Sequence, residues 1–165
     1  MRLLCFAVCG LLMIGGFSAL ADDTTQFNAT LVGFQATPSI LSNGNGSFTA
    51  SVDPGGTSIS YTLTFSDLSS NVTASHIHFA QPGVVGNIIV LLCNSPTKPA
   101  CPTGGGTVTA TITAADVLAA PSQGISAASF SDLLRVLRSG DSYVDVHTTN
   151  HPAGEIRGQV RIGED

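Results

Sequence analysis

Apolar and polar residues alternate along most of this chain, in short runs separated by glycine, proline and asparagine. Alternation with a period of two is typical of strands that bury one face. In residues 58–65 it places Ile59, Tyr61, Leu63 and Phe65 on one side, which we expect to face the core. The pattern predicts strands at residues 27–32, 47–52, 58–65, 73–79, 87–92, 107–113, 142–147 and 154–162.

One segment follows helical spacing instead. Ser129 and Asp132 stand three residues apart, as in a capping box, and Gly140 is a stop signal. The apolar residues between them that follow this spacing are Phe130, Leu133, Leu134 and Leu137. Together with the strands, this segment predicts an all-β fold: an antiparallel β-sandwich with one short helix covering an end.

The first 21 residues have the composition of a secretory signal peptide. Arg2 precedes an apolar run over residues 3–17, and Ala19-Leu20-Ala21 is a small-residue cleavage signal. The run is too short to span a membrane, so we expect no transmembrane anchor in the mature chain. The predicted organisation is a signal peptide at residues 1–21 and one domain at residues 22–165. Cleavage near Ala21 would make the protein secreted or periplasmic.

Removal of the signal peptide would change the charge and cysteine counts. Five basic residues would remain against eleven acidic residues, and because the basic residues form no cluster, we expect no nucleic-acid partner. Only Cys93 and Cys101 would remain, and two cysteines in an exported chain usually pair. The alternative, a cysteine metal site, lacks both a nearby histidine and a zinc-binding spacing. We therefore predict a disulfide.

Two segments resemble the signatures of the CHRD (chordin) domain. The first, residues 76–93, begins His76-Ile77-His78-Phe79, and the second, residues 137–159, contains Tyr143-Val144-Asp145-Val146-His147. The similarity extends over about residues 25–163. It implies an extracytoplasmic domain, as in chordin and in exported single-domain bacterial members. The leading hypothesis is therefore a non-enzymatic binding or interaction module with a protein or glycan partner.

The four histidines lie within these two signatures. Strand alternation predicts a face opposite the core that carries His76 and His78 from one strand and Tyr143, Asp145 and His147 from another. His-x-His on one strand plus a third histidine is a common copper or zinc site, and the pattern is similar to that of copper–zinc superoxide dismutase, a Greek-key β-sandwich. The alternative hypothesis is therefore a copper or zinc site, which could be redox-active.

The ligands of that site would be His76, His78 and His147, with His151 as a possible fourth. Such a site requires the ring nitrogens to converge within about 4 Å. The competing interpretation is that the histidines hydrogen-bond loop backbone groups and serve only the architecture.

Glu155 and Arg157 follow the second histidine pair at alternate positions of a predicted strand. That placement favours an ordinary ion pair over an acid–base pair. In the metal hypothesis, the carboxylate of Asp145 or Glu155 would orient an imidazole by hydrogen bonding.

Overall fold

The computed structural model describes residues 25–163, so the predicted signal peptide lies outside the described residues. The strands are β1 (Gln26–Val32), β2 (Asn45–Val52), β3 (Ser58–Ser66), β4 (Val72–Phe79), β5 (Asn87–Cys93), β6 (Gly106–Thr113), β7 (Ser142–Thr148), β8 (Ile156–Gln159) and β9 (Arg161–Ile162). The helical elements are the 3-10 helices η1 (Gly33–Gln35), η2 (Ala114–Asp116) and η3 (Pro121–Gln123) and the α-helix α1 (Phe130–Ser139). Within this range no helix is long and apolar enough to cross a membrane.

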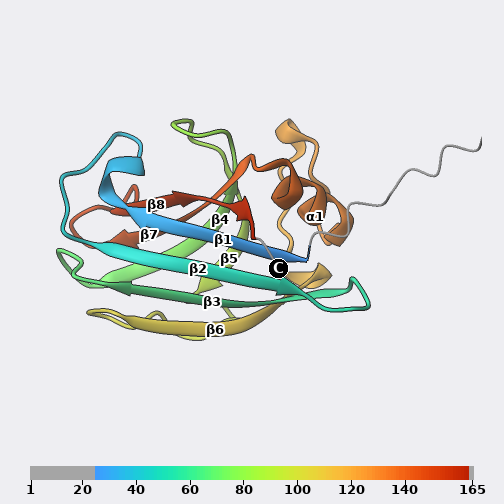
Figure 1. Cartoon of the computed structure of the whole chain (residues 1–165), viewed down its shortest axis with the longest axis horizontal. Helices are drawn as coiled ribbons and strands as arrows, with labels where there is room; N and C mark the ends of the chain where they lie inside the picture. Colours follow the sequence, from blue (N-terminus) through green and yellow to red (C-terminus); the bar gives the residue numbers. More distant parts are fainter. Residues whose placement is uncertain (1–24, 164–165) are drawn as a thin grey trace, which may run out of the picture.

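All the strands belong to one antiparallel sheet, in the order β5-β4-β7-β8-β1-β2-β3-β6, with β9 beside β1. Strands β8 and β1 are joined only at Val32 and Arg157, and the sheet folds there into two layers (Figure 1). One layer is β5-β4-β7-β8 and the other is β1-β2-β3-β6. The outer strands β5 and β6 also contact each other, so the sheet is nearly closed. The connections from β3 to β4 and from β5 to β6 cross between the layers, as in a Greek key. The predicted all-β sandwich is confirmed.

The core lies between the two layers. Ile59, Tyr61, Leu63 and Phe65 on β3 are each at most 2% exposed, which confirms the predicted core face. The Tyr61 hydroxyl donates a hydrogen bond to the carbonyl oxygen of Leu92, so its polar end is satisfied inside the core. The period-two pattern was sufficient here because one face of the strand meets the other layer and the opposite face meets solvent.

The predicted helix covers one end of the sandwich (Figure 1). The Ser129 side chain accepts a hydrogen bond from the Asp132 amide, and Gly140 ends the helix in the left-handed conformation. Leu133 and Leu137 are almost fully buried against the core. Both the caps and the apolar stripe agree with the sequence analysis.

The predicted disulfide is confirmed. Cys93 at the end of β5 bonds Cys101 and closes the loop that follows this strand. Inside the loop, the buried ammonium of Lys98 pairs with the carboxylate of Asp116 in η2. The covalent bond and the ion pair together hold the loop against the sandwich.

The predicted last strand at residues 154–162 is divided in the structure. β8 ends at Gln159 and pairs with the last residue of β1, whereas β9 pairs with the start of β1. Gly154 and Glu155 belong to the turn before β8 rather than to a strand. The division lets Arg157 face one set of loops while Arg161 reaches the end of α1, where it donates to the Gly140 carbonyl.

Candidate metal centre

The site is built on two neighbouring strands, β4 and β7. Their antiparallel register places His76 directly opposite Asp145 and His78 opposite Tyr143. Side chains directly opposite share one face of the sheet, and diagonal neighbours are within reach of long side chains. His147, two residues after Asp145, therefore falls on the same face. This is the face predicted from the alternation, opposite to the buried Ile77 and Val144.

That face is covered by loops rather than open to solvent. Tyr143, His78 and Asp145 are only 3–6% exposed. The cover includes Ala36 and Thr37 after η1, Val85 before β5, and Ala153 and Gly154 before β8. The expectation that Tyr143, Asp145 and His147 lie outside the core layers is correct. Their side chains are nevertheless less exposed than those of a simple surface strand, because these loops fold over them.

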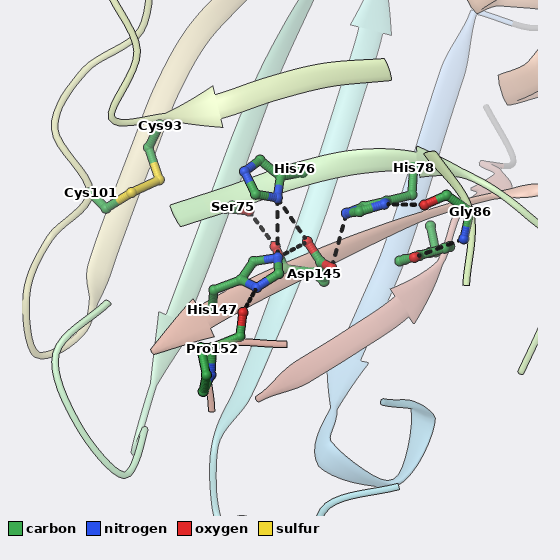
Figure 2. Close-up of polar contacts among 10 residues, drawn as sticks. Ser75, His76, His78, Gly86, Cys93, Cys101, Asp145, His147 and Pro152 are labelled. Carbon is green, nitrogen blue, oxygen red and sulfur yellow. Dashed lines mark hydrogen bonds and ion pairs between the residues drawn. A yellow bond between two sulfur atoms is a disulfide. The ribbon is translucent and has the colours of Figure 1, made fainter. Parts of the chain in front are cut away.

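Three imidazoles and one carboxylate converge under this cover, as Figure 2 shows. His147 Nε2 lies 3.1 Å from His76 Nδ1 and 3.1 Å from Asp145 Oδ1. His76 Nδ1 is 3.7 Å from that same carboxylate oxygen. His78 Nε2 approaches the other oxygen, Oδ2, to 3.1 Å. One potential ligand atom from each residue lies within 4.8 Å of all the others.

Backbone carbonyls fix the orientation of two of the rings. His78 Nδ1 lies 2.9 Å from the Gly86 carbonyl oxygen, and His147 Nδ1 lies 2.9 Å from that of Pro152. Because a carbonyl can only accept, each Nδ1 carries a hydrogen and donates it. In the neutral imidazole the Nε2 atom then has a free lone pair, and both Nε2 atoms point at Asp145 (Figure 2).

Two glycines allow the loops to present those carbonyls. A Cβ at Gly86 would lie 1.9 Å from the Phe79 carbonyl oxygen, so only glycine fits where the backbone at Gly86 passes the backbone at Phe79. Gly154 has a φ of 107°, which lets the turn after β7 close so that Pro152 reaches His147. The carbonyl partners are therefore placed by local backbone constraints on either side of the cluster.

The cluster contains buried acceptor atoms that face one another. His78 Nε2 and Asp145 Oδ1 are both buried, and with neutral imidazoles neither has a hydrogen-bond partner among the described residues. The 3.1 Å contact between His78 and Asp145 joins two acceptors when the ring is neutral. A buried polar atom without a partner costs about 1–3 kcal/mol. The cluster is therefore satisfied only when a cation, either a proton or a metal ion, lies between these atoms.

The protonation equilibria reflect that competition. Burial lowers the pKa of His76 to about 4, although the Asp145 charge opposes the shift. Burial also acts to lower the pKa of His147, but the hydrogen bond and charge of Asp145 outweigh it and raise that pKa above its usual value. For Asp145, burial acts to raise the pKa, and the contacts with His147 and His78 reverse the effect and hold it at about 2. Asp145 is thus a carboxylate at neutral pH.

The structure does not bring every candidate residue into this cluster. His151 lies in the turn after β7 and is not part of the four-residue group. Its backbone closes the turn, because its carbonyl oxygen accepts from the amides of Thr148 and Gly154. The ring of His151 is therefore displaced from the cluster by the conformation of the turn.

Glu155 and Arg157 form no ion pair with each other, contrary to the sequence-based prediction. Glu155 is fully buried, and its carboxylate accepts from the Ser42, Ser69 and Thr148 hydroxyls and from the Ser69 amide at 2.6–2.8 Å. Glu155 precedes β8, so the strand alternation that would align it with Arg157 does not apply. It also orients no imidazole, and of the two carboxylates considered for that role only Asp145 contacts the histidines.

A cavity of about 230 Å³ opens beside the cluster. Its walls include His78, Asp145 and His147 from the cluster, and also Arg157. The sequence contained no signal for this cavity or for the two carbonyl partners, because each depends on how the loops fold back over the strands, and loop conformation has no periodic pattern in the sequence.

Comparison with models of protein families matches the CHRD domain over residues 27–160. The matched segment contains the entire four-residue cluster and both cysteines of the disulfide. No curated protein and no solved structure matches the chain.

Proposed function

Because the chain belongs to the CHRD domain family, a family of extracellular-type domains, we propose that it is a non-enzymatic, extracytoplasmic module that binds one copper or zinc ion. The ion is held by His76, His78, His147 and the carboxylate of Asp145. The disulfide supports a secreted or periplasmic location, since such bonds persist in oxidising compartments.

One observation carries the proposal: ring nitrogens of two histidines point at the buried carboxylate of Asp145, and two of these facing acceptor atoms, His78 Nε2 and Asp145 Oδ1, are buried without a partner. His147 Nε2 and His78 Nε2 each lie 3.1 Å from an oxygen of Asp145. Ligand atoms bound at about 2.0 Å in a tetrahedron are about 3.3 Å apart. The spacings of 3.1–3.7 Å among His76, His147 and Asp145 already fit that value. A small movement of the His78 ring completes the set.

The donor set favours a borderline metal over a hard cation. Imidazole suits copper and zinc, whereas calcium and magnesium require mostly oxygen ligands. The carbonyl partners of His78 and His147 supply the hydrogen bonds that fix ring orientation in metal sites. His76 presents Nδ1, so on metal binding its proton moves to Nε2.

The competing cation is a proton, which would make the cluster a set of structural imidazolium–carboxylate contacts. The two alternatives are distinguished by isothermal titration of the purified, oxidised protein with Cu(II) and with Zn(II) at pH 7.5. We expect one ion per chain with a Kd below about 1 µM. His78→Ala, His147→Ala and Asp145→Asn should each weaken binding at least about tenfold.

His151→Ala is the matched control, since it removes an imidazole that lies next to the cluster but outside it. It should leave the affinity unchanged. Absence of binding to the wild-type protein, or equal loss in His151→Ala and His147→Ala, would contradict the proposal. The histidines would then be architectural, and the partner would be a protein or a glycan.

A further inference from the structure

Arg157 is a buried cation that forms no ion pair among the described residues, although the charge of Asp145 acts on it from the neighbouring strand. Its side chain belongs to a residue only 4% exposed, and among the described residues no carboxylate forms an ion pair with it. Nη1 donates to the Thr37 hydroxyl at 2.7 Å and Nη2 to the Gln81 carbonyl at 3.0 Å. These two bonds account for two of the five N–H groups of a guanidinium. A buried charge normally has a partner of opposite sign.

The guanidinium is held rigidly in the wall of the cavity beside the histidine cluster. Its carbon lies 3.5 Å from the centre of the Tyr143 ring, and the same ring stacks on His78 with the two planes 5° apart. Arg157 on β8 is also directly opposite Asp145 on β7. The cation and the proposed metal ligands are therefore parts of one packed assembly that borders the same space.

The charges in that space do not balance once a metal is bound. Of the residues that the structure describes, Asp145 is the only acidic one in the cavity wall. A divalent ion, one carboxylate and one guanidinium leave two positive charges, since imidazole ligands are neutral. Glu155, the next acidic residue along the chain, is occupied by four other donors. A monoanion from solution would halve this excess positive charge.

We propose that the cavity binds a small monoanion of the carboxylate or bicarbonate class, which contacts the Arg157 guanidinium and coordinates the metal through one of its atoms. The anion takes a fifth coordination position, beyond the four protein ligands, in place of a water at that position, so no bond other than the coordination bond changes. The volume of about 230 Å³ equals about eight waters at about 30 Å³ each, which admits an ion of a few heavy atoms but not a drug-sized ligand. This inference rests on the proposed metal site.

The test uses azide as a small monoanionic probe and the copper-loaded protein. Azide binding is followed by the azide-to-copper charge-transfer absorption, and copper affinity is measured separately in each variant. Arg157→Gln should weaken azide binding by about tenfold, the loss of one charge-assisted contact. Copper affinity in this variant should be equal to or tighter than that of the wild type, because a neighbouring positive charge is removed. An arginine that served only to hold the loops would instead weaken copper binding when replaced.

Arg161→Gln is the matched control, since Arg161 lies on the exposed strand β9 and bonds the Gly140 carbonyl outside the cavity. It should leave azide binding unchanged. A second variant avoids any folding defect. Val85 lines the cavity but is 67% exposed, so Val85→Glu adds a negative charge that repels the azide anion at a position that tolerates substitution. It should weaken azide binding about threefold relative to Val85→Gln.

Equal azide affinity in the wild type and Arg157→Gln, together with no difference between Val85→Glu and Val85→Gln, would overturn the anion site. Copper binding would survive that outcome, so the metal site would stand. Failure of copper to bind at all would instead overturn the proposed function and, with it, this inference.

Discussion

Replacement of Glu155 is the sharpest test of how the loops above the site are held. Its carboxylate joins Ser42 in the loop before β2, Ser69 in the loop before β4, and Thr148 at the end of β7. The side chain is fully buried. Glutamine has the same shape, and its carbonyl oxygen can still accept from the Ser69 amide while its NH₂ group donates to hydroxyls. The substitution Glu155→Gln therefore removes the charge and little else.

The magnitude follows from the four contacts. A hydrogen bond to a charged group is stronger than a neutral one by about 1 kcal/mol, so four such bonds set an upper limit of about 4 kcal/mol. Removal of a buried charge recovers part of its desolvation cost. We expect the free energy of unfolding to fall by about 2 kcal/mol. Glu155→Ala, which leaves the Ser69 amide without a partner, should cost about 3–5 kcal/mol.

The pH dependence identifies the cause. Burial acts to raise the pKa of Glu155, and the hydrogen bonds from Ser42, Thr148 and Ser69 outweigh it, so the folded pKa lies below the ordinary value of 4.5. A lowered folded pKa contributes stability that is fully present above the unfolded pKa and is lost as the pH falls through the folded pKa. The difference between the wild type and Glu155→Gln should therefore be constant at neutral pH and shrink below about pH 4.5.

The assay is urea unfolding of the metal-free protein, followed by far-ultraviolet circular dichroism because the chain has no tryptophan. Metal must be absent, since a ligand that binds only the folded state would add stability. Asp67→Asn is the control: Asp67 is exposed, and its substitution should change stability by less than about 0.5 kcal/mol. An equal loss for Glu155→Gln at pH 7 and pH 3.5 would refute the charged-carboxylate explanation.

Two further predictions concern the metal site and the disulfide. Zinc affinity should fall at least about tenfold between pH 7.5 and 5.5, because a proton on His147 Nε2 competes with the metal and the pKa of His147 is raised. His76, with a pKa of about 4, stays neutral in this range. A zinc affinity that does not change with pH in a competition titration would contradict direct ligation by His147. The double substitution Cys93→Ala with Cys101→Ala should lower the free energy of unfolding by about 2–3 kcal/mol, since the disulfide closes a short loop. An unchanged urea midpoint would show that the Lys98–Asp116 ion pair holds the loop without the disulfide.

The sequence by itself determined all the strands up to β7, their core face, the capped helix and the disulfide, but not the division of the last predicted strand into β8 and β9. Each depends on local information: a period of two, a capping residue, or a pair of cysteines in a chain with an export-like leader. The face that carries His76, His78 and His147 also followed from alternation. β7 nevertheless buries both of its faces, one in the core and one beneath loops. Periodicity alone could not distinguish the second kind of burial from exposure.

Only the tertiary structure decided what surrounds that face. His76 and Asp145 are 69 positions apart in the chain, and the strand register sets their separation. The Gly86 and Pro152 carbonyls, the serine hydroxyls around Glu155 and much of the cavity wall beside Arg157 come from loops without periodicity. The contacts of such loops depend on loop conformation and on packing against the strands, neither of which has a periodic signal in the sequence. Strand alternation therefore assigned each histidine to a face, and loop packing decided which atoms meet there.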